Sequence, residues 1–278
     1  METLKTDIPK TTLSNDVEIP RLGLGVLKAK NGEEVENAIL SAFENDYRLI
    51  DTAAIYGNEY GVGNAIKKSG IERSEIFLTT KVWNNDQGYD KTLKAFDRSL
   101  DLLQTDYVDL YLIHWPVKGE FKETWKALES IYKNGQARAI GVSNFQIHHL
   151  KELFSEAEIK PMVNQVEVHP HLRQQELLEF SQSHNMLLQA WRPIMMGQVN
   201  LIPELRHIGL KYGKTPAQIA LRWLIQRGIL VIPKSTNPVR IAENADVFDF
   251  ELTQSEMEVI HLLDRERRMG PDPDNFNF

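Results

Sequence analysis

The sequence predicts an α/β protein folded as a (β/α)8 barrel of the TIM type. Short apolar runs rich in β-branched residues alternate along the chain with longer stretches in which apolar residues recur at helical spacing. This alternation is typical of repeated βαβ units and a parallel sheet. Eight such runs within 278 residues suit one closed barrel, so we expect residues 1–278 to form a single domain.

The predicted elements follow one another as strand and helix. The strands lie near residues 22–26, 48–51, 76–81, 107–114, 138–142, 163–168, 187–191 and 230–233. The helices between them each carry an apolar face, and they span residues 33–44, 91–103, 122–133, 147–154, 174–183 and 217–226. A doubly wound sheet is the alternative fold. It expects a G-x-G-x-x-G turn after an early strand, and the stretch from Gly23 to Lys28 has only the first two glycines.

Some segments fall outside this alternation. Residues 11–19 predict a small N-terminal β-hairpin, and residues 203–212 predict an extra helix. Residues 253–265 predict a final helix, because Thr253 and Glu256 have the spacing of a capping box. The tail, residues 270–278, is rich in turn-forming residues and contains two phenylalanines. We expect it to form a C-terminal loop over the active site.

Composition excludes several classes of function. The chain has no cysteine, which excludes disulfides, thiol catalysis and thiolate metal sites. Its net charge of -7 gives no support for a nucleic-acid partner. No apolar run is long enough for a membrane span, and the N-terminal stretch lacks the apolar region of a signal peptide. We therefore expect a cytoplasmic protein without membrane or nucleic-acid partners.

Three polar residues each end a different predicted strand. They are Asp51, Lys81 and His114, and Tyr56 follows Asp51 in the loop. Each residue alone is more often structural, but the carboxyl ends of barrel strands meet at one mouth, where active sites form. A lysine ammonium beside a tyrosine favours phenolate, so we expect Lys81 to lower the pKa of Tyr56. Asp51 would keep Lys81 charged, and His114 would hydrogen-bond a substrate oxygen.

This group suits proton delivery to a carbonyl oxygen, a form of general acid catalysis. Side chains do not supply hydride, so reduction of that carbonyl would require a nicotinamide cofactor.

The chain resembles a known family, the aldo-keto reductases. Five segments carry the resemblance: residues 51–59 (DTAAIYGNE), 80–83 (TKVW), 109–116 (DLYLIHWP), 141–145 (GVSNF) and 232–236 (IPKST). The resemblance runs from about Val17 to the last residue in the expected order. It is strongest to the bacterial branch of diketogluconate-reductase and glyoxal-reductase type proteins.

The resemblance implies a (β/α)8 barrel and NADPH-dependent reduction of aldehydes and ketones. It assigns Tyr56 as proton donor, Lys81 and Asp51 as its tuning partners, and His114 as the residue that orients the carbonyl. It also implies a set of cofactor contacts. These are Gly25, Val26, Leu27, Asp51, Ser143, Asn144, Gln165, Trp191, Arg192, Pro193, Ile194, Lys234, Ser235, Thr236, Arg240 and Asn244.

The residues themselves support a phosphate site near the end of the chain. Lys234, Ser235, Thr236 and Arg240 supply two cations and two hydroxyls within seven residues of an otherwise acidic protein. Arginine offers phosphate a bidentate fork, whereas the structural interpretation is a solvated basic turn. We predict a preference for NADPH over NADH of about tenfold or more.

Two positions depart from the family pattern. Arg192 stands where a small residue, often serine, is usual, and we expect its guanidinium to contact the cofactor pyrophosphate. Leu27 stands where an aromatic residue is common, which would widen one wall of the substrate pocket. The predicted pocket walls are Leu27, Tyr56, Trp83, His114 and Trp115. Aromatic walls suit small aldehydes, α-keto aldehydes and aryl aldehydes.

Two other functions remain open from the sequence. One is a non-enzymatic barrel that senses NADPH for a partner, which the four intact catalytic positions argue against. The other is a metal-dependent hydrolase, with His169 and His171 or His148 and His149 as a metal pair. The sequence shows no clear carboxylate set to complete such a site, so we expect no metal. We also expect a monomer.

Overall fold

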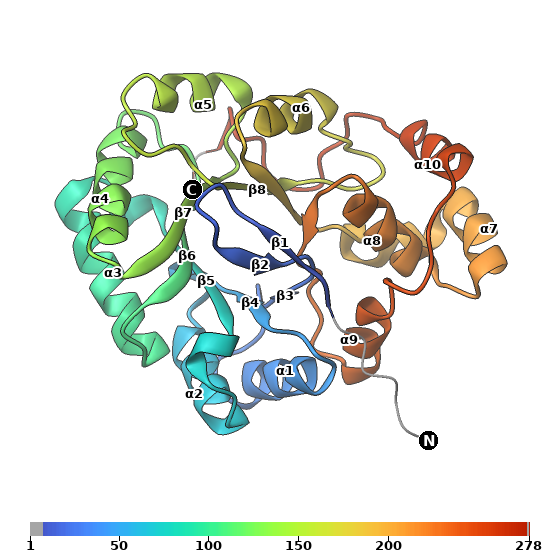
Figure 1. Cartoon of the computed structure of the whole chain (residues 1–278), viewed down its shortest axis with the longest axis horizontal. Helices are drawn as coiled ribbons and strands as arrows, with labels where there is room; N and C mark the ends of the chain where they lie inside the picture. The colour runs from blue at the N-terminus through green and yellow to red at the C-terminus, as the bar shows by residue number, and fades with distance from the viewer. Residues whose placement is uncertain (1–7, 277) are drawn as a thin grey trace.

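The computed structural model describes residues 8–276 and residue 278. Eight parallel strands form one sheet at the centre, in the order β10-β9-β8-β7-β6-β5-β4-β3, and helices surround it (Figure 1). The strands are β3 (Leu24–Gly25), β4 (Leu49–Asp51), β5 (Phe77–Val82), β6 (Val108–Ile113), β7 (Ala137–Ser143), β8 (Val163–Glu167), β9 (Leu187–Trp191) and β10 (Leu230–Val231). Each predicted strand is present, and the predicted α/β barrel is confirmed.

The two ends of the sheet meet at β3 and β10. Parallel bridges join Leu22 to Val231 and Gly25 to Lys234, and the amide of Gly23 donates to the carbonyl of Val231 at 2.9 Å. A Cβ at Gly25 would lie 3.0 Å from the carbonyl oxygen of Ile232, which is tighter than ordinary contact. Gly25 therefore permits close strand approach at the barrel seam, and the closed sheet excludes the doubly wound alternative.

The helices lie outside the sheet. They are α1 (Glu33–Glu44), α2 (Glu59–Ser69), α3 (Tyr89–Leu103), α4 (Phe121–Lys133), α5 (Ile147–Phe154), α6 (Gln175–Ser183), α7 (Pro203–Tyr212), α8 (Pro216–Gln226), α9 (Pro238–Ala245) and α10 (Gln254–His261). The extra helix α7 and the final helix α10 are confirmed, and the Thr253 hydroxyl accepts from the Glu256 amide as the capping box requires. Helices α2 and α9 were absent from the predicted set. In α2, Gly61 and Gly63 break the apolar pattern because neighbouring segments pack directly against their backbone.

An antiparallel hairpin covers the amino end of the barrel. It pairs β1 (Lys10–Thr12) with β2 (Glu18–Pro20), as predicted. The amide of Asn15 in its turn donates to the carbonyl of Arg138, at the start of β7. Leu13 and Ile19 are buried in the core, so the hairpin closes this end and leaves the carboxyl ends of the strands open for a site. Across residues 8–276 and 278, no helix has the length and apolar character needed to cross a membrane.

Candidate active site

A cavity of about 1100 Å³ opens at the carboxyl ends of the strands. Most of the predicted site residues line it. They are Gly25, Leu27, Asp51, Tyr56, Trp83, His114, Trp115, Ser143, Asn144, Gln165, Trp191, Arg192, Pro193, Ile194, Lys234, Ser235, Thr236, Arg240 and Asn244. Two predicted residues do not reach the cavity wall. Val26 is buried in the core, and Lys81 is buried behind the wall.

A buried ion pair forms the floor of the catalytic group. Lys81, on β5, donates from Nζ to Oδ1 of Asp51 at 2.7 Å and to the carbonyl oxygen of Thr52 at 2.7 Å. The side chains of Lys81 and Asp51 are 0% and 3% exposed. Burial lowers the pKa of Lys81, and the adjacent Asp51 carboxylate opposes that change. Two charges this well buried persist only as a hydrogen-bonded pair, so each fixes the position of the other.

The loop after β4 returns Tyr56 over this pair. The short 3-10 helix η1 (Ala54–Tyr56) ends at Gly57, which has a left-handed backbone with φ 65°. That turn leaves the Tyr56 side chain half-buried in the cavity wall, with Lys81 Nζ 5.1 Å from the centre of the tyrosine ring. The predicted approach of tyrosine to lysine is therefore present in the structure.

The expected effect of Lys81 on the tyrosine is wrong. Burial of the ring raises the pKa of Tyr56 well above its ordinary value, and the negative charge of Asp51 raises it further. The ammonium of Lys81 is bonded to that carboxylate, and it does not bring the pKa of the phenol below its ordinary value. Tyr56 consequently holds its proton firmly at neutral pH, which suits a donor rather than a base.

His114 faces the tyrosine from the end of β6. Its ring meets those of Tyr56 and Trp83 edge-on, with centroids 5.7 Å and 5.1 Å apart. Burial and the positive charge of Lys81 lower the pKa of His114 well below its ordinary value. The imidazole is therefore neutral at pH 7. It then carries one N–H that can donate to a carbonyl oxygen without a competing positive charge.

Amide and hydroxyl side chains extend the site along β7, β8 and β9. Gln165 donates from Nε2 to Oδ2 of Asp51 at 2.6 Å, and Ser143 donates to the carbonyl oxygen of Gln165 at 2.7 Å. Asn144 donates to the carbonyl oxygen of His114 at 2.9 Å and accepts from the indole N–H of Trp191 at 2.9 Å. These bonds link Gln165 to Asp51 and Asn144 to the backbone of His114. The bond from Trp191 to Asn144 holds the indole ring in the cavity wall.

A basic region lies at another part of the same wall. Lys234, Ser235, Thr236 and Arg240 all line the cavity near the start of α9. Asn237, which is not among the predicted site residues, caps that helix by accepting from the backbone amides of Val239 and Arg240. Asparagine directly before a proline that starts a helix is a capping signal, so this residue was detectable from the sequence.

Arg192 lies between the cavity and the C-terminal tail. It has a left-handed backbone with φ 53°, and its guanidinium stands 5.2 Å from the centre of the Trp191 ring. Nη1 of Arg192 is 4.0 Å from the buried carboxylate of Glu167. The same carboxylate accepts from the backbone amides of Met269 and Gly270 at 2.9 Å and 3.1 Å. Glu167 therefore anchors the start of the tail beside Arg192 in the cavity wall.

The tail reaches the cavity through its phenylalanines. Phe278 stacks on Trp83 with centroids 5.8 Å apart and meets Trp115 edge-on at 5.3 Å, while Phe276 packs on Trp115 at 5.0 Å. The amide of Asn84 donates to the carbonyl oxygen of Phe278 at 3.1 Å. The predicted C-terminal loop over the site is present, and contacts between its phenylalanines and the two tryptophans hold it there.

Several residues at the site were missed. One group belongs to η4 (Met195–Leu201), which lines the cavity through Met196, Gly197, Gln198, Asn200 and Leu201. This segment contains left-handed residues and lacks helical periodicity, so no pattern in the sequence marked it. Glu167 was visible as a carboxylate at a strand end, but its partners come from the irregular tail.

The two histidine pairs do not support a metal-dependent hydrolase. His169 bonds to Glu167 through Nε2, and none of His148, His149, His169 or His171 lines the cavity. The pairs therefore stand apart from the groups that could carry chemistry.

Comparisons with known proteins agree with this site. The model of the aldo/keto reductase family matches residues 21–265. Glyoxal reductase of Bacillus subtilis is 55% identical over 266 residues, which are 96% of this chain and 96% of that protein. Methylglyoxal reductase DkgA of Escherichia coli is 47% identical, covering 93% and 94% of the two chains. A Gox0644 mutant solved in complex with NADPH superposes with a TM-score of 0.93 at 42% identity, covering 97% and 99%. The chain belongs to the aldo/keto reductase family.

Proposed function

We propose that this chain reduces small aldehydes and ketones to alcohols with NADPH. The observation that carries the proposal is the buried Lys81–Asp51 pair beneath a protonated Tyr56, with a neutral His114 on the other side. Proton donor and N–H donor thus converge on one place in the cavity wall, as reduction of a carbonyl requires. The named reductases among the relatives support the same reaction class.

The residues present fit NADPH. Basic Lys234 and Arg240 line the cavity where a 2′-phosphate would find charge-assisted bonds, and Gly25 lines the same cavity. The held indole of Trp191 offers a flat face for a nicotinamide ring. Ser143, Asn144 and Gln165 would hold its carboxamide, and Arg192 would meet the pyrophosphate. Bound NADPH supplies the hydride that side chains lack.

The side chains then have separate tasks in our proposal. Tyr56 keeps a proton at its hydroxyl oxygen and delivers it to the carbonyl oxygen of the substrate. His114 donates its N–H to that oxygen and orients it. Lys81 and Asp51 hold Tyr56 in place, and Trp83 and Trp115 exclude water with the tail. A structural role for Tyr56 alone would not require a neutral imidazole opposite it.

Cofactor preference tests the basic region. We expect kcat/KM with NADPH to exceed that with NADH by about tenfold or more, because Arg240 and Lys234 pair with the extra phosphate. Arg240→Ala should reduce that ratio mainly through the KM for NADPH. Lys67→Ala, at an exposed position on α2 away from the cavity, is the matched control. Equal efficiency with both cofactors would contradict the assignment.

Substrate turnover separates the enzyme from the sensor. Purified chain is incubated with NADPH and either methylglyoxal or 4-nitrobenzaldehyde, and loss of NADPH absorbance is followed. We expect turnover of both, because Leu27 leaves one wall open and the others are aromatic. Tight NADPH binding without turnover of either aldehyde would favour a sensory barrel. We further propose that residues 1–278 act as one domain and as a cytoplasmic monomer, which light scattering and fractionation would test.

A further inference from the structure

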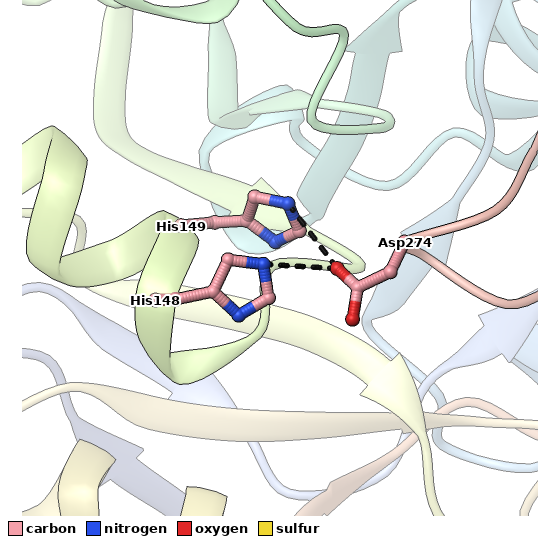
Figure 2. A group of neighbouring side chains, drawn as sticks. All are labelled: His148, His149 and Asp274. Atoms are coloured by element: carbon pink, nitrogen blue, oxygen red, sulfur yellow. Dashed lines mark ion pairs between the residues drawn. The ribbon is translucent and has the colours of Figure 1, made fainter.

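A cluster of metal-ligand side chains joins α5 to the C-terminal tail (Figure 2). Nε2 of His148 and Nε2 of His149 lie 2.9 Å and 3.4 Å from the same oxygen, Oδ1 of Asp274. Among residues 8–276 and 278, this is the one group of three histidine, aspartate or glutamate side chains whose donor atoms all lie within 4.8 Å of one another. The cluster does not line the catalytic cavity.

The arrangement of the two rings is unusual for neighbours in a helix. Consecutive helical residues project in different directions, so their side chains do not normally face one another. Here the ring centroids are 3.9 Å apart, and both Nε2 atoms point at Asp274 (Figure 2). The His149 ring is held edge-on against Phe145 at 5.8 Å, which limits its movement. His148 and Asp274 remain 62% and 50% exposed, so a solute can reach the cluster.

The donor set suits a particular class of ion. Two imidazoles and a carboxylate are ligands that Zn²⁺ accepts, and imidazole also suits Ni²⁺ and Cu²⁺. Tetrahedral Zn²⁺ with bonds of about 2.0–2.1 Å sets its ligand atoms about 3.3 Å apart. The observed separations of 2.9 Å and 3.4 Å to Asp274 are close to that value. We propose that His148, His149 and Asp274 bind a divalent transition-metal ion such as Zn²⁺, with water completing its coordination.

One hydrogen bond sets the expected strength. The backbone amide of Gln146 donates to Nδ1 of His149 at 3.2 Å. Nδ1 is then the acceptor of the neutral ring, and the ring proton lies on Nε2. A metal at Nε2 would displace that proton to Nδ1 of the same ring, where it removes the acceptor for Gln146, so this hydrogen bond is lost. A bond of this kind contributes about 1 kcal/mol. The site therefore binds more weakly than a closed structural zinc site with four protein ligands, and we expect a Kd in the micromolar range.

Asp274 lies in the tail just before the phenylalanines that cover the cavity mouth. Phe276 packs on Trp115, and Phe278 packs on both Trp115 and Trp83 at the cavity mouth. An ion shared between α5 and Asp274 fixes the tail at a point just before these contacts. Bound metal consequently holds the tail closed and slows exchange of substrate and product. This kinetic consequence rests on the proposed reductase function, whereas the binding site does not.

Binding is tested first, without reference to activity. Zn²⁺ is titrated into the full chain at neutral pH by isothermal titration calorimetry, and we expect one ion per chain. His148→Ala removes one ligand and Asp274→Asn removes the charge of another, so each should raise the Kd for Zn²⁺ by about tenfold or more. His207→Ala, an exposed histidine on α7, is the matched control and should bind as the parent does. The melting temperature of each variant checks that it is folded.

Two binding results overturn the proposal. One is the absence of saturable Zn²⁺ binding in the parent chain. The other is unchanged binding in both His148→Ala and Asp274→Asn. The kinetic arm follows NADPH oxidation with and without Zn²⁺, and we expect inhibition that a chelator reverses and that His148→Ala lacks. Binding without inhibition would overturn the coupling to the tail, and a chain that binds Zn²⁺ but never oxidises NADPH would overturn the proposed function alone.

Discussion

The catalytic group and the rim of the cavity are built in different ways. Asp51, Lys81 and His114 stand on or directly after strands of the closed sheet, and neighbouring strands fix their spacing. The rim consists of η4 and the tail, which have little regular structure and are fastened by side-chain contacts. The difference teaches that the barrel sets which chemistry is available, while a few anchoring residues set access to it.

The two regions also use charge differently. Lys81 and Asp51 form a buried ion pair beneath Tyr56, where burial is the main cause of the raised tyrosine pKa and the charge of Asp51 adds to it. The Glu167 carboxylate, at the end of β8, instead accepts from the backbone amides of Met269 and Gly270 and bonds to His169. These bonds lower the pKa of Glu167 and offset the cost of its burial. The Lys81–Asp51 pair is thus a buried ion pair beneath Tyr56, whereas the Glu167 carboxylate holds the start of the tail.

The largest expected effect is on chemistry at the catalytic group. Tyr56→Phe removes the proton donor and keeps the ring, so kcat for aldehyde reduction should fall by about 10²–10⁴-fold. NADPH affinity, measured by quenching of tryptophan fluorescence, should change little. Tyr60→Phe is the control, because Tyr60 is 52% exposed on the next helical turn. Reduction by Tyr56→Phe at near the parental rate would remove Tyr56 from the mechanism.

Stability distinguishes the buried pair from an ordinary polar contact. Lys81→Met leaves the Asp51 carboxylate buried without its counter-ion, which should cost about 3–5 kcal/mol in the free energy of unfolding. The double variant Asp51→Asn with Lys81→Met removes both charges and should recover most of that loss. Both quantities come from urea unfolding, with Lys67→Met as the exposed control. Equal destabilisation of the single and double variants would show that the two charges are not coupled.

The meeting of Asp51, Lys81 and His114 at one end of the barrel was largely predictable from the sequence because strand ends are predictable. Apolar runs mark where Asp51, Lys81 and His114 stand, and barrel geometry brings strand ends to one mouth. The order of strands and the hairpin followed from the same patterns. The direction of the Tyr56 pKa was not predictable, because sequence spacing does not show that burial outweighs the neighbouring ammonium.

The rim was predicted poorly for a physical reason. Its residues meet through contacts between segments far apart in the chain, such as Glu167 with Gly270 and Asn84 with Phe278. Such contacts leave no periodic signal. Residues with a left-handed backbone, such as Met196, are also hard to predict, because methionine has no preference for that conformation. The extent of helix α2 was not predicted, because its glycines serve close packing and interrupt the apolar pattern.

The anchor at Glu167 can be loosened without touching the catalytic group. Glu167→Gln keeps the shape but removes the charge that binds the amides of Met269 and Gly270. Charge-assisted bonds of this type contribute about 1.5–3 kcal/mol, so KM for NADPH and for aldehyde should rise by about tenfold. The value of kcat should change less than KM. Glu204→Gln, exposed on α7, is the control, and a fall in kcat alone would place Glu167 in the chemistry instead.

The smallest predicted effect concerns pH and His114. Its pKa in the folded chain lies well below the ordinary value near 6.5 of the unfolded chain, so the unfolded state binds more protons at acidic pH. Stability should therefore be lost as pH falls below about 6.5, by at most about 1.4 kcal/mol per pH unit from this residue. Urea unfolding at pH 7.5 and 5.5 measures the loss. His114→Gln should show a smaller loss than the parent, although other histidines with lowered pKa, such as His171, still contribute. Identical losses in the two proteins would mean that His114 is not held neutral by its surroundings, and the N–H donor role assigned to it would fail with that result.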